Sequence, residues 1–103
     1  MIPLQSQEQF EQMRASQRSK DVLIYFTAKW CGPCRAFDWE SIKSSFAKYT
    51  VYICDVDENT YTPGFCSVRS IPNFLLVKSD SSIVGPKQTS DPAKLLEWLK
   101  ESS

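Results

Sequence analysis

The chain has 103 residues, 42% of them hydrophobic, which is enough for one core and excludes a disordered chain. Its 12 basic and 12 acidic residues balance, so charge gives no reason to expect nucleic acid or an anionic membrane as a partner. The absence of histidine excludes a histidine general base and every metal site with a histidine ligand. We expect a single domain over residues 1–103.

The N-terminal segment over residues 1–6 lacks the charged and apolar regions of a signal peptide. No apolar run in the chain is long enough to span a bilayer. We therefore expect a cytoplasmic protein with no membrane partner.

The first half of the chain predicts strands that alternate with helices. Residues 6–9 form a plausible capping box, Phe10 and Met13 begin an apolar face, and the run after Asp21 has the composition of a buried strand. On the second expected helix, three side chains should point inward: Phe37, Ile42 and Phe46. The expected elements are a strand at 2–5, a helix at 7–17, a strand at 22–27, a helix at 34–48 and a strand at 50–56.

The second half is more irregular. Residues 57–67 are polar and interrupted by Pro63-Gly64, so any helix there should be short. Strands are expected at 74–77 and, as a short edge, at 83–84. Asp91-Pro92 predicts the start of a last helix, whose buried stripe is Leu95, Leu96 and Leu99. This element order favours a layered α/β fold with strands between helices.

The first buried strand is followed directly by Trp30-Cys31-Gly32-Pro33-Cys34, which therefore lies at a strand-to-helix turn. Free N–H groups at a helix start favour a thiolate, the reactive form of cysteine. Pro33 suits the first helical turn and limits the loop, so the two sulfur atoms stay close. We expect a dithiol redox switch in which Cys31 is the nucleophile and Cys34 resolves the mixed disulfide. Lys29 could add cationic stabilisation, or could simply be solvated.

An inert disulfide and half of a zinc site are the alternatives for this pair. Nineteen residues separate Cys34 from Cys54, and eleven separate Cys54 from Cys66, so there is one close cysteine pair where a zinc knuckle supplies two. Cys54 lies within an apolar strand, where a free cysteine acts as a small hydrophobic residue. We expect no metal site.

Two segments resemble the thioredoxin family. The pentapeptide over residues 30–34 is similar to its active site, and Arg69-Ser70-Ile71-Pro72-Asn73-Phe74 resembles the segment in which a cis-proline faces the redox pair. The stretch over residues 55–58 and the last helix lie at matching spacings. The resemblance spans nearly the whole chain. It implies a thioredoxin fold, with a central mixed sheet of about five strands and about four helices in three α/β/α layers.

The resemblance also implies an activity, which is reduction of disulfides in partner proteins through a redox-active Cys31–Cys34 disulfide. Such a protein binds no cofactor and receives electrons from NADPH through the flavin enzyme thioredoxin reductase. Its partners would be that reductase and disulfide-containing proteins such as peroxiredoxins or other reductases. A monomer is expected.

The resemblance assigns further roles around the two cysteines. The residues that would support the active site are Trp30, Gly32, Pro33 and Pro72. The residues that would bind substrate are Trp30, Ile71, Pro72 and Asn73. The family bond before the matching proline is cis, so we expect a cis Ile71–Pro72 bond that turns the Ile71 backbone toward the redox pair. An extended substrate segment could then pair with it as an added strand.

Cys66 resembles a surface cysteine found at this point in some eukaryotic thioredoxins. It could be a regulatory thiol, it could link two chains into a dimer, or it could serve only in packing.

The chain departs from the family pattern at several positions. Tyr25 stands where the family carries a buried aspartate, which is understood to help deprotonate the second cysteine. Water, Asp55 or Asp57 could take over that role. The proline that kinks the family's helix after the motif is missing from residues 38–40, and Asn73 is commonly threonine.

Two other activities remain open on the sequence. One is a disulfide isomerase or oxidase module, although such proteins commonly have histidine before the second cysteine, where Pro33 favours a more reducing pair. The other is a redox-inactive binding module in a larger assembly, which only the missing aspartate supports.

The tyrosine in place of the acid predicts a slower resolving step and a shifted Cys34 titration. A Tyr25→Asp variant should therefore change the pH dependence of turnover, because it returns a proton acceptor to the core beside the redox pair. Turnover measured across neutral pH for both proteins tests this. Superimposable profiles would contradict it.

Overall fold

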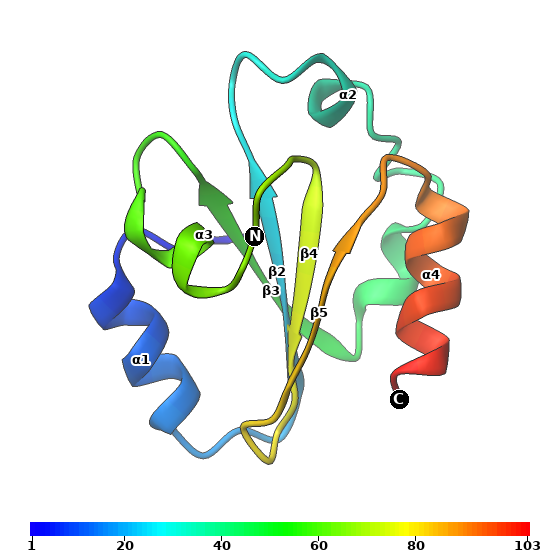
Figure 1. Ribbon diagram of the computed structural model, residues 1–103. Coiled ribbons are helices and arrows are strands. Elements are labelled where there is room, and N and C mark those ends of the chain that lie inside the picture. The colour runs from blue at the N-terminus through cyan, green and yellow to red at the C-terminus, as the bar shows by residue number, and fades with distance from the viewer.

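A five-stranded mixed sheet forms the centre of the computed structural model, which describes residues 1–103 (Figure 1). The strands are β1 (Ile2–Pro3), β2 (Asp21–Thr27), β3 (Tyr49–Asp55), β4 (Asn73–Val77) and β5 (Ile83–Gln88). Their order across the sheet is β1-β3-β2-β4-β5. β1 and β2 both pair with β3 in parallel, whereas β4 runs antiparallel to β2 and to β5. The predicted thioredoxin fold with a central mixed sheet is confirmed.

Helices cover both faces of this sheet. They are α1 (Gln7–Ala15), α2 (Gly32–Arg35), the 3-10 helix η1 (Lys43–Phe46), α3 (Tyr61–Phe65) and α4 (Pro92–Glu101). Figure 1 shows α1 and α3 on one side of the strands and α4 on the other. No helix is both long and apolar enough to cross a membrane.

The alternation of side chains along β2 divides the core into two halves. Leu23 and Tyr25 belong to the half that also contains both motif cysteines and Leu95 of α4. Val22, Ile24 and Phe26 belong to the other half, which packs under α1. All five of these β2 side chains are buried, so β2 is covered on both faces as well as paired on both edges. The cysteine motif follows the end of β2, so it is anchored to a strand that is held on both faces and on both edges.

The two long helices begin where the sequence predicts. The Ser6 hydroxyl caps α1 by accepting from the Gln9 N–H, and the Gln9 side chain accepts from the Gln5 N–H. Asp91 caps α4 by accepting from the Ala93 N–H, with proline as the first helical residue. Each cap satisfies an N–H group that has no partner within its helix.

The helix predicted over residues 34–48 is wrong. The chain forms one turn of α2, then turns, then the separate η1. Phe37 and Trp39 both contact the ring of Tyr25, with centroids 6.3 and 4.9 Å away, and side chains two residues apart on a helix do not share a face. Ser41 also donates its N–H and its hydroxyl to Asp38, which stabilises a turn there. Phe37 and Ile42 are buried as expected.

The edge strand β5 is longer than the predicted 83–84 and includes Gly85-Pro86, which an edge strand tolerates. Gly85 has φ +110°, and a Cβ there would lie 3.1 Å from the Phe74 carbonyl oxygen and 3.2 Å from the Trp98 ring. Only glycine fits at this position, where the β5 backbone lies close to both β4 and α4.

Arg18 fastens the end of α1 to the end of β4. Its guanidinium donates to the carbonyl groups of Met13, Arg14 and Ser16, and also to that of Lys78. The last carbonyl groups of a helix have no partner within it, and a cation there also matches the helix dipole.

We expect Arg18→Met to lower the free energy of unfolding by about 2 kcal/mol, because it removes hydrogen bonds from a charged donor. Urea denaturation measures this. Arg18→Lys should lose less, because it keeps the charge, although one ammonium nitrogen replaces the two guanidinium nitrogens that donate here. An unchanged midpoint in Arg18→Met would contradict the assignment.

Candidate functional site

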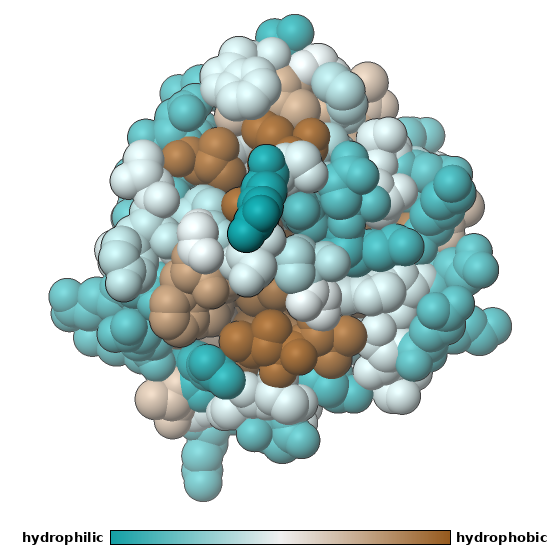
Figure 2. Space-filling view, viewed as in Figure 1, coloured by the Kyte–Doolittle hydropathy of each residue, from teal (hydrophilic) through white to brown (hydrophobic).

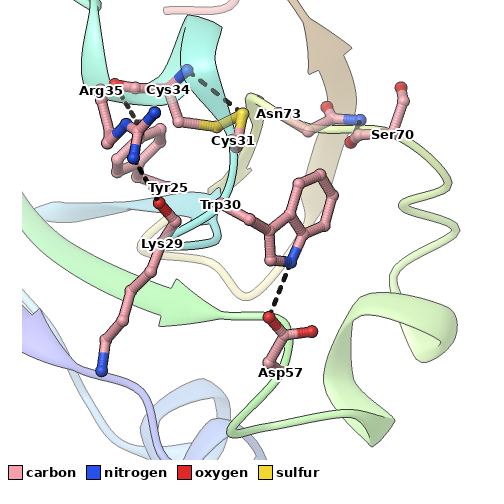
Figure 3. Close-up of a disulfide and its surroundings, with 9 residues drawn as sticks. All are labelled: Tyr25, Lys29, Trp30, Cys31, Cys34, Arg35, Asp57, Ser70 and Asn73. Atoms are coloured by element: carbon pink, nitrogen blue, oxygen red, sulfur yellow. Dashed lines mark hydrogen bonds between the residues drawn. A yellow bond between two sulfur atoms is a disulfide. The ribbon is translucent and has the colours of Figure 1, made fainter.

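The two motif cysteines form a disulfide at the end of β2 (Figure 3). Cys31 is the residue that caps α2, and its Sγ accepts from the Cys34 N–H at 3.2 Å. The Cα atoms of Cys31 and Cys34 are 5.2 Å apart, a usual spacing for a disulfide. Pro33 lies in the first turn, where its missing N–H leaves no helical bond unmade. Because α2 has one turn, the local Cys34 donor, rather than a long helix dipole, would stabilise a Cys31 thiolate.

Trp30 forms an exposed rim beside the disulfide. Its side chain is 66% exposed, and its indole Nε1 donates to the Asp57 carboxylate at 2.8 Å (Figure 3). That carboxylate also lies on a loop ordered by the Asp57 N–H donating to Asp55. The Asp57 carboxylate thus binds Trp30, the Asp55 carboxylate accepts within its own loop, and neither forms a hydrogen bond with Cys34.

Lys29 does not face the redox pair. Figure 3 shows its side chain extending away from the sulfur atoms, and its ammonium lies 4.0 Å from the Glu58 carboxylate. The ammonium is almost fully exposed, so this ion pair is weak. Arg35 donates to the Lys29 carbonyl oxygen at 3.2 Å and so holds the loop rather than the thiol.

The Ile71–Pro72 bond is cis, as predicted. Ile71 is half-buried and packs against both halves of the core, including the half that contains Cys31, and Pro72 is buried. An open groove of about 410 Å³ runs between Trp30, Pro63, Val68 and Ile71. Figure 2 shows patches of hydrophobic surface in the upper part of this face, where Figure 1 places the loops around β2 and β4.

Asn73 has a different place from the one expected of a substrate-binding residue. It is 3% exposed, its amide donates to the Ser70 carbonyl oxygen at 3.2 Å, and its side-chain oxygen accepts from the Phe74 N–H. Its side chain therefore shapes the loop around Pro72 from inside.

Tyr25 is part of the site, although its sequence position suggested only a missing acid. Its hydroxyl donates to the Cys34 carbonyl oxygen at 3.3 Å, and its ring stacks on Phe74 at 5.2 Å between centroids. Burial raises its pKa above the usual value, while the Thr27 and Trp39 side chains act in the opposite direction. At neutral pH Tyr25 is therefore a neutral donor and not a base. The sequence did contain a signal for this role, namely the aromatic residues at positions 37, 39 and 74, whose rings pack around Tyr25.

The other two cysteines are free and lie in the opposite half of the core. Cys54 is fully buried, as predicted for a small hydrophobic residue. Cys66 is 7% exposed, so it does not have the surface position that the resemblance implied. Burial raises the pKa of Cys54 to about 12 and that of Cys66 to about 11. No group of three or more cysteine, aspartate or glutamate side chains lies close enough together to hold a metal ion.

Comparison with known proteins identifies relatives along nearly the whole chain. The thioredoxin family model matches residues 2–101. The thioredoxin-like protein slr1139 of Synechocystis is 36% identical over 96 residues, which is 90% of this chain and 87% of that protein. A thioredoxin of Geodia cydonium is 32% identical over 101 residues, covering 96% and 95% of the two chains. The X-ray structure of Fasciola hepatica thioredoxin superposes with a TM-score of 0.86 at 25% identity and covers both chains completely.

The raised pKa values of Cys54 and Cys66 predict a loss of stability in alkali. An unfolded thiol has a pKa of 9.0, whereas in the folded chain the two pKa values are about 12 and about 11. At pH values between these limits, the unfolded chain has released thiol protons that the folded chain retains. The free energy of unfolding contributed by these thiols is therefore intact below pH 9 and falls as pH rises. Urea midpoints of the oxidised protein from pH 8 to 10.5 measure this fall. A Cys54→Ala/Cys66→Ala variant should lose part of the slope, and an unchanged slope would contradict the assignment.

Proposed function

The chain belongs to the thioredoxin family, and from this premise we propose that it reduces disulfides in partner proteins through the Cys31/Cys34 pair. The observation that carries the proposal is the Cys31–Cys34 disulfide at a helix start, with the Cys34 N–H directed at the Cys31 sulfur. An N–H donor at this atom favours the thiolate that attacks a disulfide.

The reaction proceeds in two exchanges. The Cys31 thiolate attacks one sulfur of the substrate disulfide, and the other substrate sulfur leaves as a thiolate. The Cys34 thiolate then attacks the Cys31 sulfur, forms the Cys31–Cys34 disulfide and displaces the second substrate sulfur. Two electrons pass to the substrate, whose two sulfur atoms take up protons from water as the two active-site thiols give theirs up. No bound cofactor takes part.

The proposed substrate site is the groove beside Trp30, with Ile71 on its other side, Pro72 next to Ile71 in the chain, and Asn73 supporting the loop from within. The backbone of Ile71 supports this placement, because no hydrogen bond within the chain uses its N–H or its carbonyl. An extended substrate segment could pair with both groups as an added strand. Such a site takes polypeptide rather than a small molecule.

We further propose that the disulfide is reduced again by a flavin-dependent thioredoxin reductase using NADPH. The substrates would be disulfide-containing proteins such as peroxiredoxins or other reductases. We propose a cytoplasmic monomer. These assignments rest on family membership.

The proposal is tested by trapping partners with a Cys34→Ser variant in cell extract. Without its resolving thiol, Cys31 should accumulate mixed disulfides with partner proteins, which a non-reducing gel separates from the free protein. The wild type should show far fewer adducts, because Cys34 resolves them. Reduction of a test protein disulfide, coupled to NADPH oxidation by thioredoxin reductase, should be lost in the variant.

The matched control is Cys31→Ser, which removes the proposed nucleophile and should trap nothing. If this control formed as many adducts, Cys31 would not be the attacking cysteine, and its assignment as the nucleophile would be wrong. No adducts in Cys34→Ser, together with no coupled turnover in the wild type, would overturn the reductase function and favour a redox-inactive binding module.

A further inference from the structure

We infer that Tyr25 is a positioning residue for the resolving step. Its hydroxyl donates to the Cys34 carbonyl beside the Phe37 N–H, and together these two donors hold a carbonyl that the short helix leaves without its usual partner. The inference rests on the proposed function, because it concerns the second exchange of that reaction. It connects two departures of this chain, the tyrosine at position 25 and the short α2.

The first argument is the early end of α2. The helical bonds stop after the Arg35 N–H donates to the Cys31 carbonyl and the Ala36 N–H to that of Gly32. In a continuing helix the Cys34 carbonyl would accept from the Asp38 N–H, four residues on. No such bond is present. The Cys34 carbonyl accepts instead from the Phe37 N–H at 3.2 Å and from the Tyr25 hydroxyl at 3.3 Å.

The second argument is that the Tyr25 donor is itself fixed. Tyr25 lies in the middle strand, opposite Ile53 of β3 and Phe74 of β4. Its ring lies nearly parallel to that of Phe74, and the ring of Trp39 packs edge-on against it at 4.9 Å. The residue is 3% exposed. The hydroxyl thus links Cys34 to the centre of the sheet rather than to another loop.

The third argument is that the same packing ends the helix. Phe37 and Trp39 leave the helical path, and both reach the Tyr25 ring. A helix that turned through residue 38 would carry one of these two rings away. The chain therefore keeps its aromatic cluster, and the Cys34 carbonyl has the Tyr25 hydroxyl as a second donor beside the Phe37 N–H.

The consequence concerns the second exchange. Cys34 must attack the Cys31 sulfur while Cys31 is bound to substrate, so the rate depends on how closely the Cys34 backbone is held in reach. Tyr25 acts on this geometry and not on a proton, because it is a neutral donor at neutral pH. Attack by Cys31 on the substrate does not use the Cys34 carbonyl and should not change.

Tyr25→Phe removes the donor and keeps the ring. The reaction with one equivalent of 5,5′-dithiobis(2-nitrobenzoate) separates the two exchanges, because the first thionitrobenzoate is released by Cys31 and the second by Cys34. A hydroxyl-to-carbonyl distance of 3.3 Å is long, so we expect a modest effect, with the second release slowed about two- to fivefold. The first release should be unchanged. The equilibrium constant for forming the Cys31–Cys34 disulfide against glutathione should fall by a similar factor.

The matched control is Tyr52→Phe, in the neighbouring strand β3, whose hydroxyl makes no hydrogen bond in the chain and which packs against the other half of the core. Its two releases should match those of the wild type. A second variant carries 4-aminophenylalanine at position 25, which returns a neutral donor to the same place. This variant should release the second thionitrobenzoate as fast as the wild type. Because it keeps a donor at position 25, it also tests the inference if Tyr25→Phe folds poorly.

The outcomes separate the inference from the function on which it rests. A Tyr25→Phe second release as fast as that of the wild type overturns the inference and leaves the reductase function standing. The same follows if both releases slow equally, if the control slows as much, or if 4-aminophenylalanine fails to restore the rate. A wild type that never gives the second release overturns both, because Cys34 then resolves nothing.

Discussion

The hydrogen-bonded ladders on both edges of β2 are the constraint on which the site depends. β3 runs parallel to β2 on one side and β4 antiparallel on the other, so the end of β2 lies beside the start of β4, with Phe26 opposite Asn73. The motif leaves from the end of β2, and the Ile71–Pro72 loop enters β4. The pairing therefore brings the redox pair and this loop to one edge of the sheet, although about forty residues separate them in the chain. A one-residue slip would turn every β2 side chain to the wrong half of the core.

Aromatic packing takes over from backbone hydrogen bonding in the segment after the motif. Phe37 and Trp39 pack on Tyr25 and Phe74, and Trp39 also contacts Phe46 of η1 at 5.3 Å. Each aromatic pair adds about 0.5–1.5 kcal/mol beyond the area that it buries. A chain of such pairs can hold a segment that has only one helical turn. The buried acid of the family would be poorly placed among these rings, because a charged carboxylate there would have no partner to offset its desolvation.

Much of this arrangement could be predicted from the sequence, and the failures have physical causes. The positions of the strands and the caps of Ser6 and Asp91 depend on local patterns. These predictions are confirmed, except that β1 is shorter than the predicted 2–5 and β5 is longer than the predicted 83–84. The helix over 34–48 failed because Phe37, Ile42 and Phe46 fit a helical period while Trp39 does not, and only the fold shows what Trp39 packs against. The inward places of Cys66 and Asn73, and the long reach of Arg18 to Lys78, depend on contacts between distant segments. No local pattern encodes them.

The four cysteines are divided by the sheet into two chemically different pairs. Cys31 and Cys34 lie with the α4 half of the core, at a turn where the Cys34 N–H donates to the Cys31 sulfur. Cys54 and Cys66 lie with the α1 half, where burial holds their pKa values well above the ordinary thiol value. Because a thiol must ionise before it attacks, the second pair is poorly reactive at neutral pH. The sheet therefore places the redox chemistry on one face while both faces contain sulfur, and it lets four cysteines share a small domain without competing for the same disulfide.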